Sequence, residues 1–290
     1  MSNYKVGIND KIVPDLTAKE YHAEPGITRS MISALKISLA HFCRVRDNQS
    51  LKEPTSAMKI GSIVHSLALN PSLFQKEFFI VPKIDRRTKE GKLYDKETEI
   101  ILQGERERVY EEELKIAHDI ALSLSKDKNF SEIMKGNILN EASIFYTCPD
   151  TNLLCKTRPD IWNKDRNIVC EVKTTNDFIN FDRSVRAYDY HIQAAMQIEG
   201  LEIMSKTKIE DFYFVVVSTI PPHDVVTYKM DYETLAQGRQ EMKDALTVIS
   251  IAQEENQWNK DLETVRILTL KSFQRTNPFS HLLKAYHIYE

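Results

Sequence analysis

The sequence is poor in the residues that build flexible linkers, disulfide frameworks and metal–thiolate sites. Only eight of its 290 residues are glycine, and no internal repeat or low-complexity segment is present, which argues against long flexible linkers. Its four cysteines lie far apart, with no CxxC pair and no histidine nearby at ligand spacing, so neither a zinc site nor a redox motif is indicated. We expect reduced thiols, mostly in the core, at Cys43, Cys148, Cys155 and Cys170.

Long apolar runs and a strong charge bias are also missing. No run approaches the roughly 20 apolar residues that span a bilayer, and the N-terminus lacks the basic-then-apolar order of a signal peptide. We therefore expect a cytoplasmic protein with no membrane partner. The formal net charge is −3, so any nucleic-acid contact must come from a local patch. No GxxxxGK[ST] stretch is present, and therefore no ATPase is indicated.

The composition is that of an ordinary globular protein, with 42% hydrophobic and 28% charged residues. We expect residues 1–290 to form a single domain, with a mainly helical part over 1–140, a core over 141–255 and a tail over 256–290. In the first part, helices are predicted over 31–45, after Thr28 or Ser30, and over 57–69, before Asn70-Pro71. A short strand is predicted over 78–81, and a long amphipathic stretch over 96–126 indicates one helix or a broken one.

A basic segment lies between that strand and that helix. Residues 83–92 carry five cations against two anions and almost no apolar side chains. The segment can be a nucleic-acid contact or simply a solvated loop, and composition does not choose between them. The candidate contacts within it are Arg86, Arg87, Lys89 and Lys92.

From residue 142 onward the pattern changes to short runs of β-forming residues. Turn-forming residues at 149–152 and 163–167 separate three such runs and predict two successive hairpins. Further elements are a helix, a buried strand, another strand and a last helix. The order β-β-β-α-β-β predicts an α/β fold with a mixed central sheet flanked by helices. The predicted ranges are 142–148, 153–162 and 168–174 for the first strands, 184–204 for the helix, 211–219 and 225–230 for the later strands, and 232–255 for the last helix.

Charged residues that could take part in catalysis fall inside the second predicted hairpin. Asp160 follows Arg158-Pro159, and ten residues separate it from Glu171-Val172-Lys173. Side chains alternate on a strand, so Glu171 and Lys173 share one face while Val172 faces the other. A hairpin would place Asp160 next to Glu171. The competing interpretation is a solvated strand face with an unrelated turn aspartate.

Two crowded carboxylates repel each other, and a hard divalent cation relieves that repulsion. We therefore expect Asp160 and Glu171, with the carbonyl of Val172, to hold Mg²⁺, or Mn²⁺ in its place, with two ions per site. Such a metal lowers the pKa of bound water and neutralises a phosphate, while Lys173 would orient or help deprotonate that water. Phosphodiester hydrolysis is the predicted chemistry. Gln193 and Gln197, one helical turn apart, can face the same edge or lie on the surface.

Several motifs in a fixed order support this prediction. They are Tyr21-His22 with Pro25-Gly26-Ile27, Gly61-Ser62-Ile63-Val64-His65, Arg86-Arg87-Thr88, Cys155-Lys156-Thr157-Arg158-Pro159-Asp160, Glu171-Val172-Lys173-Thr174-Thr175 and Tyr190-His191-Ile192-Gln193. From about Tyr21 to the helix after Lys229, the chain resembles the nuclease domain of the RecE exonucleases (exonuclease VIII), of the PD-(D/E)XK superfamily.

The resemblance implies a phage- or prophage-type recombination enzyme that digests one strand of linear duplex DNA, 5′ to 3′. It would leave a 3′ overhang for a RecT-like single-strand annealing protein and would form a homo-oligomeric ring, a tetramer in preference to a trimer. It also implies active-site roles for His65 and Gln193 beside Asp160, Glu171 and Lys173, with His65 as a metal or water contact. Glu141 would be a further metal carboxylate or a solvated strand end, and Arg158 and Thr174 join the expected DNA contacts.

Two positions depart from the family pattern. Glu171 stands where RecE has an aspartate, and Gln197 stands where the family has a tyrosine, so the role of that tyrosine does not carry over. Two alternatives remain: a restriction-like or structure-specific endonuclease on the same fold, and a DNA-binding scaffold without catalytic activity. The presence of Asp160, Glu171 and Lys173 together argues against the scaffold.

Overall fold

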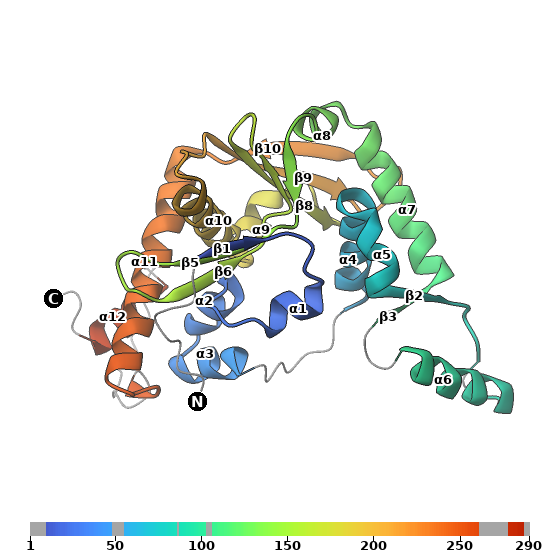
Figure 1. Ribbon diagram of the computed structural model, residues 1–290, viewed down its shortest axis with the longest axis horizontal. Helices are drawn as coiled ribbons and strands as arrows, with labels where there is room; N and C mark the ends of the chain where they lie inside the picture. Colours follow the sequence, from blue (N-terminus) through green and yellow to red (C-terminus); the bar gives the residue numbers. More distant parts are fainter. Residues whose placement is uncertain (1–9, 48–54, 86, 103–105, 261–277, 287–290) are drawn as a thin grey trace.

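The structure is a computed structural model that describes residues 10–47, 55–85, 87–102, 106–260 and 278–286. The part before residue 138 is mainly helical (Figure 1). No helix within the described ranges is both long and apolar enough to cross a membrane. The elements of this part are β1 (Lys11–Val13), α1 (Ala18–Ala23), α2 (Arg29–Leu35), α3 (Leu39–Arg46), α4 (Ser56–Leu69), α5 (Pro71–Glu77), β2 (Phe78–Val81), α6 (Lys89–Leu102), β3 (Glu107–Tyr110), α7 (Glu111–Lys126) and α8 (Lys128–Ile133).

Side-chain caps set where several of these helices begin. Thr28 and Thr55 accept hydrogen bonds from backbone amides in the first turns of α2 and α4, as predicted. The single helix predicted over 31–45 is wrong, because Ser38 caps a new helix, α3, through the His41 amide at 3.1 Å. The stretch over 96–126 is likewise interrupted, because β3 lies within it and pairs in parallel with β2. Val109 of β3 is fully buried.

The later part of the chain forms two sheets. The five-stranded sheet has the order β10-β9-β8-β7-β4, in which only β8 and β9 are parallel, and the three-stranded sheet has the order β1-β5-β6. The predicted mixed sheet flanked by helices is therefore confirmed. The elements are β4 (Ile138–Asn140), β5 (Ser143–Thr147), β6 (Leu154–Thr157), β7 (Ile161–Asn163), β8 (Ile168–Thr175), α9 (Phe181–Ala187), α10 (Tyr190–Ser205), β9 (Asp211–Ser218), β10 (Val225–Lys229), α11 (Tyr232–Glu254) and α12 (Ser280–Ala285).

Helices cover both faces of the five-stranded sheet. Side chains of α4 and α7 pack on one face with Val172 and Val215, and those of α10 and α11 pack on the other with Val169 and Val216. Figure 1 shows α4, α5 and α7 on one side of β8 and β9, and α10 and α11 on the other. Strands buried on both faces explain the continuous apolar run of β9.

One predicted strand, over 153–162, is divided between the two sheets. Residues 154–157 form β6 of the three-stranded sheet, and residues 161–163 form β7 of the five-stranded sheet. Proline has no backbone N–H to donate to a ladder, so Pro159 lies at the break. The prediction of one continuous strand is wrong, and the break brings the chain to the sheet edge where Asp160 lies.

Candidate active site

The hairpin of β7 and β8 brings the two carboxylates together. Ile161 pairs with Cys170, so Asp160 lies beside Glu171. The Asp160 amide donates to Glu171 Oε1 at 3.2 Å, and the Val172 amide donates to Asp160 Oδ2 at 2.7 Å. Asp160 is 7% exposed and Glu171 is 1% exposed. Two carboxylates are therefore buried side by side, as the hairpin prediction requires.

Lys173 lies on the same face of β8 as Glu171. Its Nζ donates to Glu171 Oε2 at 2.6 Å and lies 4.9 Å from the centre of the Tyr190 ring. Burial lowers the pKa of Lys173, but the charges of Glu171 and Asp160 outweigh that effect and raise it overall. For Glu171, burial and the Asp160 charge raise the pKa despite the ammonium. The site therefore holds a permanent cation beside a carboxylate that takes up a proton more readily than usual.

Two amides from consecutive turns of α10 hold the Glu171 carboxylate. Gln193 Nε2 donates to Oε2 and Gln197 Nε2 donates to Oε1, each at 2.6 Å. The sequence left Gln197 as a possible surface residue, yet it is 1% exposed. The Oε1 atoms of both glutamines are buried with no hydrogen-bond partner among the described residues. They are acceptors left open beside the two carboxylates.

His65 reaches the site from α4, on the opposite face of the sheet. Its Nε2 lies 2.9 Å from the carbonyl oxygen of Val172, and its Nδ1 lies 3.3 Å from Asp160 Oδ1. Both partners are acceptors, so the ring can donate to both of them when it is protonated. Burial lowers the pKa of His65, but Asp160 outweighs it and the pKa is raised overall. Asp160 is the counterpart, because His65 and Lys173 lower its pKa against the effect of burial.

The donor set fits a hard divalent metal ion. It offers two carboxylates and one backbone carbonyl, and the unpartnered amide oxygens of Gln193 and Gln197 lie next to it. The His65 imidazole can join this set in its neutral form, because a ring nitrogen that binds a metal must be deprotonated. Oxygen-rich sets of this kind suit Mg²⁺ and Mn²⁺. Lys173 supplies a positive charge beside Glu171, and His65 lies next to Asp160.

Glu141 and Arg158 border this cluster through backbone contacts. Glu141 donates its amide to the Asp160 carbonyl at 3.0 Å, and burial raises the pKa of its carboxyl. Arg158 donates to the carbonyl oxygens of Glu141 and Leu16 and lies over the Tyr21 ring. Its guanidinium thus holds the N-terminal part of the chain against the core. Thr174 is half-buried, and a Cβ added to Gly61 of α4 would lie 3.2 Å from its Oγ1.

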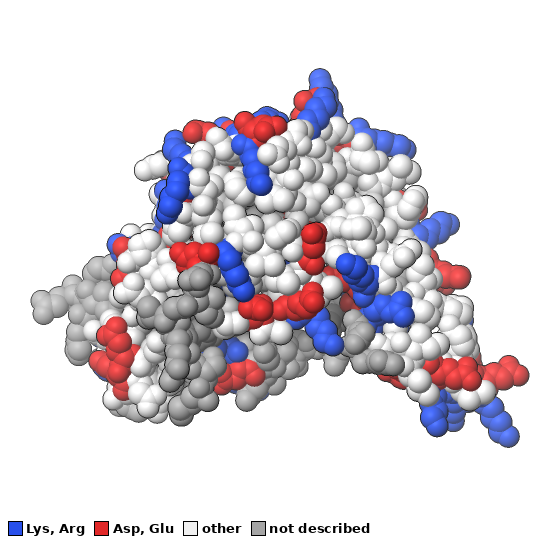
Figure 2. All heavy atoms as spheres, viewed as in Figure 1, with Lys and Arg blue, Asp and Glu red and all other residues white. Residues whose placement is uncertain are grey.

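The other residues expected to contact DNA lie far along the chain from this site. Arg87, Lys89 and Lys92 are exposed at the start of α6, and Arg86 lies outside the described residues. Figure 1 shows α6 standing away from the main body. On the face in Figure 2, acidic side chains lie along the upper edge of this arm and basic side chains along its lower edge. The segment is therefore an exposed charged arm of mixed sign.

A second charged cluster lies behind α10 and was not predicted. Asp189, His191 and Glu241 place their ligand atoms within 4.8 Å of one another, the spacing of a possible metal site. Lys36, however, contacts both carboxylates, at 3.1 Å from Glu241 Oε2. The Lys36 ammonium offsets part of their charge and already joins the two carboxylates. Members of the cluster are up to 205 positions apart in sequence, and no local pattern reveals such a contact.

The fold and the cluster of Asp160, Glu171 and Lys173 define a PD-(D/E)XK-type nuclease architecture. Residues 28–270 match the family model described as "PDDEXK-like domain of unknown function (DUF3799)", and the chain belongs to this family. PD-(D/E)XK nucleases usually use a divalent metal.

A solved structure agrees with this fold. A crystal structure of a protein named "Putative exonuclease" from Eubacterium rectale has a TM-score of 0.56 at 13% identity, over 84% of this chain and 88% of that one. The crystal structure of SSO0001 has a TM-score of 0.27 at 16% identity, over 65% of this chain and 86% of that one. This score is too low to show a shared fold. No protein with a curated description matches the chain significantly.

Proposed function

We propose that this protein is a metal-dependent, ATP-independent exonuclease of double-stranded DNA. The observation that carries the proposal is the burial of Asp160, Glu171 and Lys173 in mutual contact at one sheet edge, with Gln193 on the same carboxylate. A structural ion pair does not require a second buried carboxylate next to the first, because that arrangement costs free energy. Membership of a PD-(D/E)XK-like family supports the nuclease assignment.

Asp160, Glu171, the Val172 carbonyl and His65 would hold the metal, which we expect to be Mg²⁺, with Mn²⁺ as a substitute and two ions per site. When bound, the metal lowers the pKa of water and neutralises charge on the scissile phosphate. Lys173 is protonated in this environment, so it suits donation of a hydrogen bond to a phosphoryl oxygen as negative charge develops there. Gln193 and Gln197 hold the Glu171 carboxylate in one orientation.

The finer parts of the proposal rest on the resemblance to RecE exonucleases. They are 5′-to-3′ polarity, a 3′ single-stranded overhang, a RecT-like annealing partner and a homo-oligomeric ring, preferably a tetramer. The exposed cations Arg87, Lys89 and Lys92 on the arm at α6 are the proposed contacts to the phosphate backbone, because sequence-independent DNA binding is mainly electrostatic.

Nucleotide release from linear and covalently closed circular duplexes of the same sequence tests the proposal. We expect Mg²⁺-dependent release from the linear form only, with loss of activity in EDTA and in Lys173→Ala. Lys208→Ala is the matched control, since Lys208 is exposed just before β9, at the end of the sheet away from the site. Cutting of the circle would favour the endonuclease. DNA binding with no metal-dependent hydrolysis of either form would favour the scaffold.

A further inference from the structure

An exposed aromatic ring stands beside the candidate site without any role in it. Tyr188 is 57% exposed. Its ring centre lies 5.7 Å from that of Tyr190, and the Tyr190 ring lies under the Lys173 ammonium at 4.9 Å. A single ring therefore separates Tyr188 from the cation of the site. An aromatic ring open to water at such a place is available to a ligand bound at the site.

The backbone that carries this ring is held in place at both of its peptide groups. The Tyr188 amide donates to the Ser184 carbonyl at 2.9 Å, and Arg29 Nη1 donates to the Tyr188 carbonyl at 3.1 Å. The next residue, Asp189, has a φ of 56°, a conformation that non-glycine residues seldom adopt and that persists only where neighbouring contacts impose it. The corner between α9 and α10 is thus a defined conformation rather than a loose loop.

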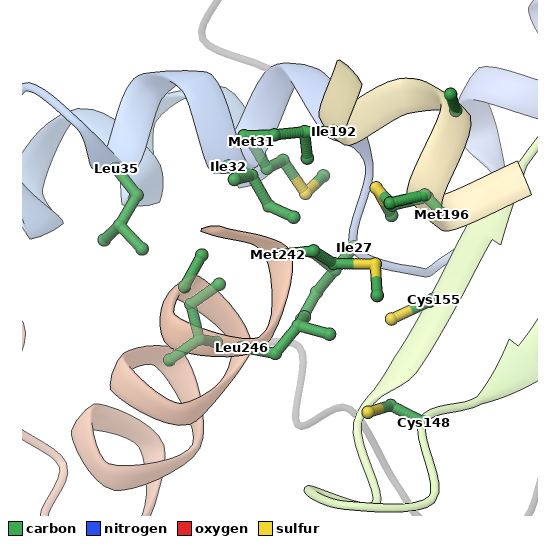
Figure 3. Close-up of a cluster of buried hydrophobic side chains, with 14 of the residues drawn as sticks. Ile27, Met31, Ile32, Leu35, Cys148, Cys155, Ile192, Met196, Met242 and Leu246 are labelled. Atoms are coloured by element: carbon green, nitrogen blue, oxygen red, sulfur yellow. The ribbon is translucent and has the colours of Figure 1, made fainter. Parts of the chain in front are cut away.

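The buried charged cluster behind α10 imposes that conformation. The Asp189 carboxylate accepts from Ser33 Oγ at 2.6 Å and from Lys36, and Lys36 also contacts Glu241 of α11. Three helices, α2, α10 and α11, are therefore joined at the corner. Figure 3 shows the apolar packing next to this junction, where Ile32 of α2, Ile192 of α10 and Leu246 of α11 belong to one buried cluster. Removal of one partner from such a network destabilises the fold, because it leaves a buried charge without its counterpart. The network therefore holds the corner in one rigid conformation.

A rigid, exposed aromatic ring is a suitable platform for stacking. We propose that Tyr188 stacks on a nucleobase of the DNA strand whose phosphodiester lies at Glu171 and Lys173. This inference rests on the proposed nuclease function. The chemistry around the ring fits a nucleotide better than an apolar protein surface, since Lys173 and Arg29 both lie over the adjacent Tyr190 ring, at 4.9 and 6.0 Å from its centre. These cations suit phosphates, while the open ring suits a base.

The stacking is independent of base identity, because each base has a π-face. It would hold the strand at a fixed distance from the catalytic groups without reading its sequence. Tyr188 would then act on binding and positioning, so that its loss raises Kd and KM more than it lowers kcat.

The test measures binding to a short duplex whose terminal linkages are nuclease-resistant phosphorothioates, by fluorescence anisotropy in Mg²⁺. The variants are Tyr188→Ala, which removes the ring, and Tyr188→Phe, which keeps it. Tyr232→Ala is the matched control, because Tyr232 is 84% exposed at the start of α11. A second set of duplexes carries one abasic nucleotide at successive positions from the end. Wild type is also assayed for hydrolysis of an unmodified duplex.

We expect Tyr188→Ala to raise Kd about tenfold, in line with the loss of one base–aromatic stack, and Tyr188→Phe and Tyr232→Ala to leave it near the wild-type value. At one position, an abasic nucleotide should weaken wild type by a similar factor and should not weaken Tyr188→Ala further. Equal Kd for wild type and Tyr188→Ala would overturn the stacking, and so would losses of affinity from the substitution and the abasic nucleotide that add at every position. In either case, hydrolysis of DNA by wild type would leave the proposed nuclease function standing. A wild type that neither binds nor hydrolyses DNA overturns both.

Discussion

The Gln197 side-chain amide donates a hydrogen bond of 2.6 Å to Oε1 of Glu171. Gln193, one turn earlier on α10, makes the same contact with Oε2. Each oxygen of the carboxylate thus accepts from one glutamine amide, at a position where the RecE family offers one glutamine and one tyrosine. Neither a point charge nor a single hydrogen bond would define the carboxylate plane as well.

Replacement of Gln197 tests this pair of amides. We expect Gln197→Leu to weaken Mn²⁺ binding by about 10- to 100-fold, the usual effect of losing a group that orients a metal ligand. Calorimetric titration with Mn²⁺ measures the affinity directly. Gln240→Leu is the control, because Gln240 donates to the Asp244 carboxylate at 2.8 Å, away from the site. Unchanged affinity in Gln197→Leu would show that Gln193 alone suffices.

His65 provides a second test, since it links Asp160 to the Val172 carbonyl across the sheet. We expect His65→Ala to raise the Mg²⁺ concentration needed for half-maximal DNA hydrolysis by about 10- to 100-fold. The measurement is initial rate against Mg²⁺ concentration. His118→Ala, an exposed histidine of α7, should behave as wild type. Equal Mg²⁺ dependence in both variants would contradict a role of His65 at the metal.

The exposed arm at α6 gives a prediction on salt dependence. Arg87→Ala should weaken DNA binding and reduce the slope of log K against log salt by about 0.9, because one fewer counterion is released. Anisotropy titrations over a range of NaCl concentrations give the slope. The Lys208→Ala variant should keep the wild-type slope. If Arg87→Ala keeps it as well, residues 83–92 are a solvated segment and DNA binds elsewhere.

The cluster behind α10 predicts how stability depends on pH. Burial raises the pKa of Glu241, but hydrogen bonds from His191 and Gln237 and the charge of Lys36 outweigh it and lower the pKa to about 2. A depressed carboxyl pKa stabilises the fold above the unfolded-state value and loses that effect as pH falls toward the folded-state value. At neutral pH the shift corresponds to about 3 kcal/mol.

Urea unfolding of wild type and Glu241→Gln at several pH values measures this contribution. We expect the difference in unfolding free energy to be largest above about pH 4.5 and to shrink steadily below it. A difference that stays constant from neutral pH to about pH 3 would mean that Glu241 stabilises the fold through packing and not through its charge.

Local patterns predicted much of the sheet and its carboxylates. The alternation in Glu171-Val172-Lys173 placed the two charged side chains on one face of β8, and the turn after Asn163 placed Asp160 next to Glu171. These features depend on neighbours along the chain, namely the two-residue period of a strand and the chemistry of a turn. The apolar run of β9 and the long helix α11 were recognisable for the same reason.

The remaining features depend on contacts between distant segments. The change of sheet at Pro159, the burial of Val109 in β3 and the corner at Asp189 each required knowledge of what packs against them. Gln197 looked like a surface residue because its partner, Glu171, lies on another element. A sequence reveals the period of a helix but not which polar residue on it meets a buried charge.

The connection between β8 and β9 has a consequence for folding. These strands pair in parallel, so the chain must cross over between them, and α10 lies within that crossover. Parallel pairing of this kind forms late, because a long loop must close first. Gln193 and Gln197 lie on that crossover, so the two amide partners of Glu171 belong to the segment that must close as a loop when β8 and β9 pair. The long-range strand pairing of the sheet and the assembly of the candidate site therefore involve the same segment of the chain.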